Sequence, residues 1–590
     1  MRIKITAIIM FLVAAVIYIA TAPSSVYTGD SGEITTAVYS WGVAHPTGFP
    51  TYIILAKLFS YLLPWIEFAH RLNIFSALSA AATIGVIFLI SQKLKINFLA
   101  GIVSAAILAF GYTFWMHAGT IQVYTFTALF FSLAIFFLLN FLEAKKKSYF
   151  YFLAAICGIG AGTHLTFLLF IPFALLFVFI KDKKALGVKK IIIFFSIALF
   201  FAAAIYSYIP LRAAQSPELN WGDPETTGSF ISYITQQDYS EKIGTRSLES
   251  LGLMMRELGK IFNREITFVG LLLFLFGVVI SYKERREWFF SGLSVIFFNI
   301  LLLANYGNSE DIIILYRYFL PSYIMVAIYI SFALQKIFFN KKYAPAVLVF
   351  PVVILLLNFN SLNRQNYNLV KNTSNYILSS VPQQSILITS GDTLSGAVMY
   401  EQKVLGKRND LVIIDDRLYT HPWYLESKKK ELEAKGFIFK DNLSYLLKEN
   451  LQKGAYSVSN GISFLKINFD FFPNGIVYKI YFKKESPELQ NIRDNNKILW
   501  ENYDLKFLDE RKFDKEFFNK ELVGLYTTGL NNLGAYLVNG GFVDEGTEYF
   551  KKSLAIRENK NALYNLTGIY SALGQTQKAL EYKKQFDLLE

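Results

Sequence analysis

Residues 5–22 read ITAIIMFLVAAVIYIATA, an apolar stretch without a charged side chain. An α-helix rises about 1.5 Å per residue, so about 20 apolar residues cross the hydrocarbon core of a bilayer. The end of this stretch, Ala20-Thr21-Ala22, also resembles a signal-peptidase site, and cleavage there is the alternative to a first transmembrane helix. In either case we expect the residues that follow to lie outside the cytoplasm.

Similar stretches recur through the first 360 residues, which predicts a polytopic α-helical membrane protein with about eleven transmembrane helices. The composition agrees, because 53% hydrophobic and 17% charged residues are rare in a soluble chain of 590 residues. The short pair within 149–181 could be a tilted or shallow hairpin. We expect spans at residues 5–22, 72–92, 97–115, 121–142, 149–163, 166–181, 190–211, 266–282, 287–304, 318–336 and 343–358.

Basic side chains gather in alternate loops, such as those at residues 93–95, 145–147 and 283–286. The positive-inside rule then makes the N-terminus cytoplasmic and the C-terminal region extracytoplasmic. These loops account for much of the net charge of +13, so nucleic acid is not an expected partner. We expect a bacterial inner membrane rather than the endoplasmic reticulum, because the chain carries no retention signal and its one cysteine, Cys157, lies in an apolar stretch.

The polarity of the chain divides it into three predicted regions. Residues 1–358 form a transmembrane domain with long outer loops at 23–71 and 212–264. The first of these loops contains an amphipathic stretch, Tyr52 to Trp65, that we expect on the membrane surface. Residues 359–520 form an extracytoplasmic α/β region, and residues 525–590 form helical repeats.

Local patterns support this reading of the C-terminal half. Residues 385–389 and 411–415 are typical of buried strands, and residues 393–405 between them are typical of a helix. Leu533, Gly541 and Gly546 recur 33 residues later as Leu566, Gly574 and Ala579, whereas Phe550 is followed at the same distance by Lys583, which does not match. This period predicts tetratricopeptide-like hairpins, which could recruit a protein partner.

The predicted spans are nearly free of ionisable residues, whereas a transporter usually carries such residues near the membrane midplane. The distribution therefore favours chemistry at the outer membrane face over passage through the bilayer. Transport or lipid flipping, with a repeat tail for partner recruitment, remains the alternative. The candidate groups near the outer ends of spans are Asp30, Glu33, His45, His70, Arg71, His117, His164, Arg212 and Arg317.

The sharpest local feature is YTGDSGE at residues 27–33. Asp30 and Glu33 share one face if a helix begins between them, and Asp30 suits the N-cap position. Beyond capping, the pair could act as a general base or hold a divalent cation such as Mg or Mn. The glycines would let the backbone approach a substrate closely.

A second feature follows at residues 42–50, GVAHPTGFP. Two prolines and two glycines near His45 predict a constrained turn. The turn could serve only as a bend into the next helix, or it could aim His45 at a site.

These motifs resemble a membrane family related to protein O-mannosyltransferases, within the GT-C glycosyltransferase superfamily. The resemblance rests on GDSGE (29–33), AHPxGxP (44–50) and RLNIFSAL (71–78). It continues through PLRAA (210–214), NWGDP (220–224), RYFLPSY (317–323) and SGD (390–392), and so covers most of residues 1–420. Thr47 departs from the family, which often has a second proline there, and we expect only a small change in the rigidity of the turn.

The resemblance implies a GT-C-like fold and transfer of a sugar, with mannose as one candidate. The donor would be a polyprenyl-phosphate sugar in the membrane lipid, and the acceptor a hydroxyl of a protein or glycan. Asp30 matches the place of the first-loop acidic residue that acts as base or organises a metal, with Glu33 as its partner. In-line attack would invert the anomeric centre.

The phosphate of such a donor calls for positive charge or convergent hydrogen-bond donors. Candidates for substrate binding are His45, Arg71, His164, Arg212, Trp221, Asp223 and Arg317. Each arginine could instead anchor the chain at the lipid interface, and Trp221 and Asp223 could simply shape a turn. No phosphate-binding loop or clustered zinc spacing occurs in the sequence, and no cofactor is certain.

Overall fold

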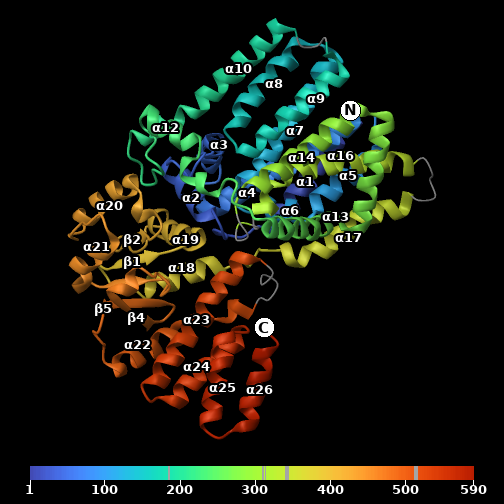
Figure 1. Cartoon of the computed structure of the whole chain (residues 1–590). Helices are drawn as coiled ribbons and strands as arrows, with labels where there is room; N and C mark the ends of the chain where they lie inside the picture. The colour runs from blue at the N-terminus through green and yellow to red at the C-terminus, as the bar shows by residue number, and fades with distance from the viewer. Residues whose placement is uncertain (184–186, 308–310, 312–313, 339–343, 510–515, 590) are drawn as a thin grey trace. The chain divides into compact units, whose positions relative to one another are not determined.

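The computed structural model describes residues 1–183, 187–307, 311, 314–338, 344–509 and 516–589 (Figure 1). The chain forms two compact units. The transmembrane unit comprises residues 1–26 and 37–367, and the C-terminal unit comprises residues 27–36 and 368–590. Tyr343, where the last predicted span begins, and residues 510–515 of the predicted α/β region lie outside the described residues.

The transmembrane unit is helical, and its apolar stretches fold as expected. Helix α2 (Ser31–Ser40) begins in the C-terminal unit and ends in this one. The other helices are α1 (Arg2–Thr21), α3 (Pro50–Ser60), α4 (Phe68–Lys93), α5 (Phe98–Phe110), α6 (Tyr112–Ala118), α7 (Val123–Ala144), α8 (Lys147–Ala161), α9 (Phe170–Lys181), α10 (Val188–Tyr206), α11 (Tyr208–Ala213), α12 (Thr227–Ile234), α13 (Leu248–Glu284), α14 (Arg286–Asn305), α15 (Ile314–Tyr318), α16 (Leu320–Ile337) and α17 (Ala344–Leu362).

Within the described residues, seven helical segments are long and apolar enough to cross a membrane: α1, α4, α7, α10 with α11, α13, α14 and α16. The bent pair α5 and α6 makes an eighth, and α8, α9 and residues 347–362 are shorter apolar helices. The polytopic helical membrane fold is therefore confirmed. How many of these helices cross the bilayer stays a prediction.

Two predicted spans differ in shape from the helices observed. Residues 97–115 do not form one straight helix, because α5 and α6 meet at Gly111 with a bend of 66°. Helix α13 begins at Leu248, well before the predicted start at residue 266, and breaks at Thr267, where φ is 62°. Hydropathy marked only the apolar half of α13, since the half before the break is polar and charged.

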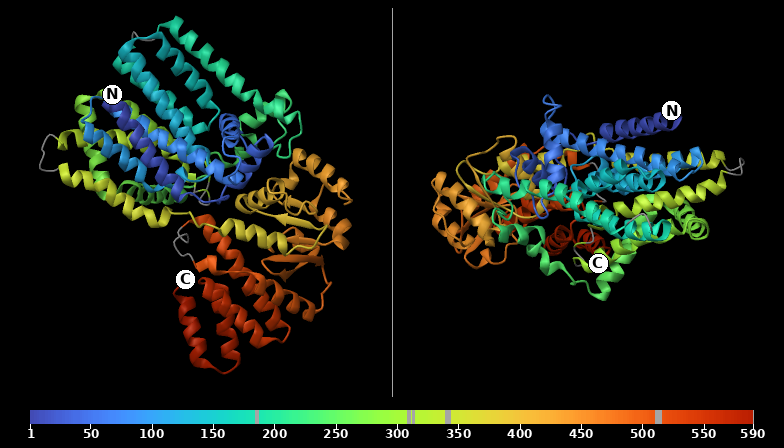
Figure 2. Two further views of the ribbon diagram at one scale, coloured as in Figure 1. Left: turned by 180° about the vertical axis from the view of Figure 1, so that it is seen from behind. Right: turned by 90° about the horizontal axis from the view of Figure 1, so that it is seen from above.

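Small residues allow close packing in the transmembrane unit, as expected where lipid removes the hydrophobic drive between helices. A Cβ added to Gly85 of α4 would lie 3.2 Å from the Ala7 carbonyl oxygen of α1. At Gly158 of α8 it would overlap the Ala198 carbonyl of α10. Figure 1 and the left view of Figure 2 show α8 and α10 side by side. These glycines therefore set how closely the helix axes approach.

The C-terminal unit opens with a five-stranded sheet of order β2-β1-β3-β5-β4. Strands β1 (Ile386–Thr389), β2 (Val412–Asp415) and β3 (Ala455–Ser457) are parallel, whereas β4 (Phe469–Asn474) and β5 (Val477–Phe482) pair antiparallel. The predicted strand–helix–strand pattern is confirmed by β1, α19 (Asp392–Lys403) and β2. Helices α18 (Leu369–Ser379), α20 (Pro422–Ala434), α21 (Leu443–Asn450) and α22 (Leu489–Asn502) accompany the sheet.

Two helical hairpins complete the C-terminal unit (Figure 1). They consist of α23 (Phe517–Asn539) with α24 (Val543–Ile556), and α25 (Lys560–Ala572) with α26 (Thr576–Asp587). In the first hairpin a Cβ on Gly534 would lie 2.8 Å from the Gly546 carbonyl oxygen, so glycine permits this crossing. The hairpins agree with the predicted helical repeats, and their assignment as tetratricopeptide repeats stays a prediction.

Candidate functional site

The acidic segment Tyr27–Thr36 lies in the C-terminal unit. Gly29 has φ of 71°, a conformation that favours glycine, and its N–H donates to Thr393 Oγ1 at 2.8 Å. Helix α2 begins directly after Asp30, whose carbonyl accepts from the Ile34 N–H at 2.9 Å. Asp30 and Glu33 are each 9% exposed, so both carboxyl groups lie in a mostly desolvated environment.

Close packing fixes this segment on α19. A Cβ on Gly32 would overlap the backbone of Gly396, and a Cβ on Gly396 would lie 3.0 Å from the Glu33 nitrogen. At the start of the segment, Tyr27 Oη donates to the Glu516 carboxylate and accepts from Asn519 Nδ2 at 3.3 Å. Gly32 of the motif therefore serves a backbone-to-backbone contact with Gly396 that no larger residue would permit.

In the transmembrane unit, the turn around His45 is as constrained as its composition predicts. Gly48 has φ of 78°, and its N–H donates to the His45 carbonyl at 2.7 Å. Tyr233 of α12 donates its hydroxyl to the Ala44 carbonyl. A Cβ on Gly48 would lie 2.7 Å from Tyr233 Oη, so glycine is required for this packing.

The turn places His45 and Phe49 in an aromatic cluster. The His45 ring meets Phe49 edge-on at 4.9 Å and Trp221 at 6.1 Å between ring centroids. Phe49 stacks on His164 at 5.8 Å. The structure thus brings together His45, His164 and Trp221, three predicted site residues that are widely separated in the sequence.

Arg317 joins the same cluster through Tyr124. The Tyr124 ring lies 5.0 Å from the His164 ring and 5.8 Å from the His117 ring, and the Arg317 guanidinium carbon lies 5.7 Å from its centroid. Arg317 Nη1 also donates to Tyr124 Oη at 3.4 Å. Tyr318 closes the group, with its ring 4.9 Å from His164. We call His45, Phe49, His117, Tyr124, His164, Trp221, Arg317 and Tyr318 the cation–aromatic cluster.

The tautomer of His164 follows from its contacts. Its Nδ1 accepts the Thr166 backbone N–H at 3.1 Å, so the neutral ring carries its proton on Nε2. An imidazole N–H and a guanidinium are both suitable donors to a phosphate oxygen.

The other two predicted arginines hold loop carbonyls and do not belong to the cluster. Arg71 donates to the carbonyls of Ile66, Pro64 and Ser60 at 2.6, 2.7 and 3.2 Å. Arg212 donates to those of Trp41 and Ser40 at 2.6 and 3.1 Å. Both guanidinium groups thus tie loops to nearby helices.

Asp223 shapes a turn, one of the two roles expected for it. It has φ of 43°, and its Oδ1 accepts from Asn220 Nδ2 at 2.6 Å. This turn presents Trp221, whose N–H donates to the Val43 carbonyl at 3.0 Å. The loop that carries NWGDP is thereby joined to the strand-like residues before His45.

Comparison with known proteins gives a family resemblance. Residues 30–187 match the family described as the Protein O-mannosyl-transferase TMEM260 N-terminal domain. The chain is 25% identical over 461 residues to the mouse Protein O-mannosyl-transferase TMEM260, covering 72% of this chain and 65% of that protein. It is 24% identical over 486 residues to the Dictyostelium discoideum Protein O-mannosyl-transferase tmem260, covering 71% of this chain and 58% of that protein. The chain therefore spans less than two thirds of the length of either relative.

A solved structure supports the fold independently. ArnT from Cupriavidus metallidurans, bound to undecaprenyl phosphate, superposes with a TM-score of 0.53 at 12% identity. The match covers 82% of this chain and 99% of that one. The chain is thus similar to protein O-mannosyl-transferases in sequence and has the GT-C type of fold that its motifs implied.

Sequence reasoning missed several residues of this region. Tyr124, Phe49 and Tyr318 are aromatic residues in a chain that is 17% aromatic, so nothing in the sequence distinguishes them. Glu265 carried a signal, since a carboxylate at the edge of an apolar stretch is unusual. It is 1% exposed, and its oxygens accept the backbone N–H groups of Thr113 and Phe114 at the start of α6.

Within the described residues, no group of three or more His, Cys, Asp or Glu side chains is arranged to hold a metal ion. Asp30 and Glu33 remain the predicted pair for a divalent cation, and a cation there would need further ligands from the substrate. Two carboxylates with phosphate oxygens are a common ligand set for Mg²⁺.

Proposed function

We propose that the chain is a membrane glycosyltransferase that moves a sugar from a polyprenyl-phosphate donor to a hydroxyl of a protein or glycan. Mannose is the leading candidate for the sugar, because the relatives are named O-mannosyl-transferases. The single observation that carries the proposal is the cation–aromatic cluster. In it, His45 of the AHPTGFP motif contacts Phe49, Phe49 stacks on His164, and Tyr124 contacts both His164 and Arg317. Its donors suit a phosphate, and its rings suit a sugar or an apolar lipid chain.

The cluster would bind the donor phosphate. Arg317 supplies the positive charge, and its hydrogen bond to Tyr124 fixes the direction of the guanidinium. His164 adds a donor through Nε2–H. As the bond from the anomeric carbon to the phosphate breaks, negative charge grows on the leaving oxygen, and fixed donors stabilise it. Arg71 and Arg212 have a structural role in this proposal, because their guanidinium groups bind backbone carbonyls.

Asp30 would act as the base, or organise a metal, with Glu33 as its partner. As base, Asp30 takes the proton of the acceptor hydroxyl while that oxygen attacks the anomeric carbon. A new glycosidic bond forms, polyprenyl phosphate leaves, and the anomeric centre is inverted. This role rests on the family resemblance of GDSGE and is supported by the low exposure of both carboxyl groups.

A transfer assay with purified full chain in proteoliposomes tests the proposal. The chain is supplied with a labelled polyprenyl-phosphate mannose or with GDP-mannose, and with a Ser/Thr-containing peptide and a glycan as acceptors. We expect a labelled product with the lipid-linked donor only. Transfer from the nucleotide sugar alone would contradict the proposal, and so would the absence of transfer from either donor.

Transport or lipid flipping is the second candidate, and Glu265 is the observation that favours it. A buried carboxylate beside a bent helix pair is common in transporters. Here both Glu265 oxygens bind backbone N–H groups of α6, which is a structural use. Counterflow of a lipid-linked sugar across the membrane without any glycosyl product would reverse the ranking.

The proposed location is a bacterial inner membrane, with the N-terminus cytoplasmic and the C-terminal unit extracytoplasmic, where an acceptor would be met. Loop charges support the orientation, while the two named relatives are eukaryotic. A membrane-impermeant thiol reagent tests it with single cysteines placed in a Cys157→Ser background. Cysteines in the C-terminal unit should react in intact cells, and labelling only after lysis would contradict the orientation.

A further inference from the structure

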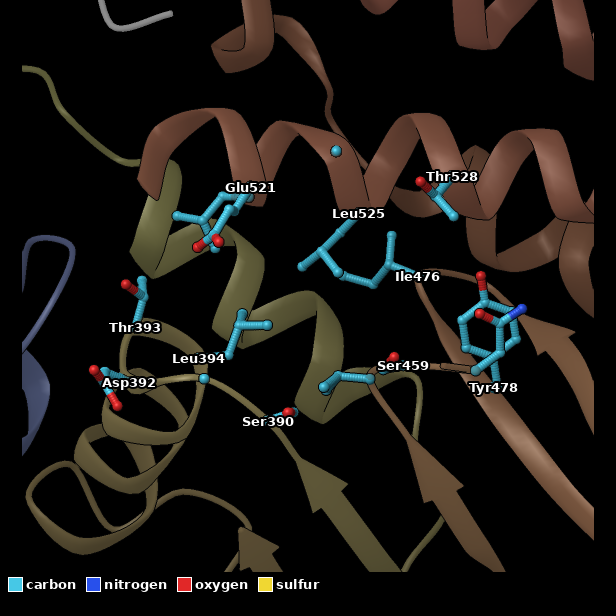
Figure 3. A pocket seen from close by; sticks show the side chains of 15 residues that line it. Ser390, Asp392, Thr393, Leu394, Ser459, Ile476, Tyr478, Glu521, Leu525 and Thr528 are labelled. Carbon is cyan, nitrogen blue, oxygen red and sulfur yellow. The ribbon is translucent and has the colours of Figure 1, made fainter. Parts of the chain in front are cut away.

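The C-terminal unit contains a cavity of about 460 Å³ that the catalytic proposal does not use. Figure 3 shows its lining from three sources: the ends of strands, the first turn of α19, and α23. A volume of this size falls in the range typical of small-molecule sites. Its polar lining includes Ser390, Asp392, Ser459, Tyr478, Glu521 and Thr528.

The cavity lies at the switch point of the sheet. The chain leaves β1 through Ser390 and α19 to reach β2 on one side, whereas β3 pairs with β1 on the other side. Ser390 and Ser459, which follow the carboxyl ends of β1 and β3, both line the cavity. In open α/β sheets, ligands bind in the crevice at this point, because the connections diverge there.

The lining selects against an anionic ligand. None of the described residues that line the cavity is Lys or Arg, whereas Asp392 and Glu521 contribute two carboxyl groups. Asp392 Oδ1 also accepts a hydrogen bond at 3.0 Å from Nη2 of Arg417, a residue outside the lining. Burial, followed by the charge of Asp392, raises the pKa of the Glu521 carboxyl above its ordinary value. The described lining therefore offers a phosphate no basic side chain to bind it.

The same lining suits a ligand with several hydroxyl groups. Carboxylates accept hydrogen bonds from hydroxyls, and Ser and Thr side chains can both donate and accept. Leu394, Leu525 and Ile476 add apolar surface, and Tyr478 adds an aromatic ring that Asn532 Nδ2 holds through Tyr478 Oη at 2.7 Å. The mixture of carboxylates, hydroxyls and a ring matches the two faces of a sugar, one of C–H groups and one of hydroxyls.

We propose that this cavity binds an uncharged sugar unit of the acceptor, so that the enzyme prefers an acceptor that already carries a glycan. The inference rests on the proposed glycosyltransferase function and names an acceptor class for it. Thr393 connects the two sites, because it lines the cavity and its Oγ1 accepts the Gly29 N–H next to Asp30. A sugar bound in the cavity would therefore lie beside Thr393, which is hydrogen-bonded to the segment that carries the proposed base.

The test measures binding of methyl α-mannoside, N-acetylglucosamine, a Ser/Thr-containing hexapeptide and inorganic phosphate to the full chain in lipid nanodiscs by saturation-transfer NMR. We expect at least one of the two sugars to bind, and we expect neither peptide nor phosphate to compete with it. Glu521→Gln should weaken the sugar's affinity at least fivefold. Thr528→Trp, an exposed position at the cavity, should abolish binding by filling the space.

Glu485→Gln is the matched control, since Glu485 is exposed in the same unit and lies outside the cavity lining. It should bind sugar like the unsubstituted chain, and all variants should share one thermal unfolding midpoint. The inference is overturned if neither sugar binds, if both cavity variants bind as tightly as the control, or if peptide or phosphate displaces the sugar.

A transfer assay separates this inference from the proposed function. Thr528→Trp should raise the KM for a glycosylated peptide at least fivefold and leave transfer to the bare peptide unchanged. Transfer that persists without any sugar binding contradicts the cavity inference alone. Sugar binding without transfer from any lipid-linked donor contradicts the glycosyltransferase proposal.

Discussion

At the residue scale, Gly32 shows how the acidic motif is built into the fold. Its missing side chain lets the start of α2 lie against the backbone of Gly396. Sequence reasoning expected the glycines to let the backbone approach a substrate, whereas Gly32 approaches another part of this chain. The approach of two backbone segments from positions 32 and 396 leaves no local signal in a single sequence.

Gly32→Ala should therefore destabilise the C-terminal unit by about 1–3 kcal/mol, because an added methyl group forces the two backbones apart. Thermal unfolding of the full chain measures the effect. Gly568→Ala in α25 is the control, since nothing lies within 4 Å of its added Cβ and alanine favours a helix. A Gly32→Ala variant as stable as the control variant would contradict the packing described.

Arg317 is the residue on which donor binding depends most in this account. Arg317→Gln removes the positive charge beside Tyr124, and we expect about a 10- to 100-fold rise in the KM for the lipid-linked donor. Arg256→Gln is the control, because Arg256 is an exposed arginine of α13. Initial rates over a range of donor concentrations give the KM of each variant. Equal KM values for Arg317→Gln and Arg256→Gln would show that Arg317 does not bind the donor.

At the element scale, helices were predictable from hydropathy and strands only in part. Residues 385–389 and 411–415 are continuous apolar stretches, so β1 and β2 were found. Strand β3 has only three residues, and neither FDFFPN in β4 nor VYKIYF in β5 shows a regular alternation of apolar and polar residues, so no local pattern set these strands apart. The bend between α5 and α6 was missed because Gly111 lies in an unbroken apolar stretch, and the carboxylate that fills the bend comes from α13.

Helix α6 should depend on Glu265 for its start. Glu265→Ala leaves the Thr113 and Phe114 N–H groups without their acceptor, at a cost of about 1–3 kcal/mol. Hydrogen exchange at residues 112–118 should speed up, and Glu265→Gln, which keeps an acceptor oxygen, should restore part of the protection. Glu257→Ala in the same helix is the control, because its pair with Lys260 lies on the surface.

Slow exchange in Glu265→Ala would show that α6 does not need this cap. The result matters for the cluster, since α6 carries His117, whose ring contacts Tyr124. Loss of donor affinity together with faster exchange would identify Glu265 as a positioning residue.

At the scale of the whole molecule, the chain combines its first outer loop with its C-terminal half. The sequence predicted a membrane domain and separate soluble regions, and nothing in it indicated that Tyr27–Thr36 packs with residues 368–590. The family motifs already pointed to this loop as functional, but its partners Thr393 and Gly396 became visible only in three dimensions.

Truncation after residue 367 should therefore abolish transfer even if the membrane helices insert normally, because the acidic segment loses the surface that orders it. Truncation after Ile556, which removes only α25 and α26, should keep transfer to a small acceptor. Membrane extraction and the transfer assay compare the two variants. Transfer by the chain truncated after residue 367 would contradict a structural role for the C-terminal unit at Asp30.

The central claim is that Asp30 acts in sugar transfer from a lipid-linked donor. The most direct test compares Asp30→Asn with Asp544→Asn, an exposed position in α24, in single-turnover transfer with bound polyprenyl-phosphate mannose. We predict a fall of at least about 100-fold in the rate for Asp30→Asn, with donor binding and membrane insertion retained, and no change for Asp544→Asn. A rate for Asp30→Asn equal to that of the control would contradict the account.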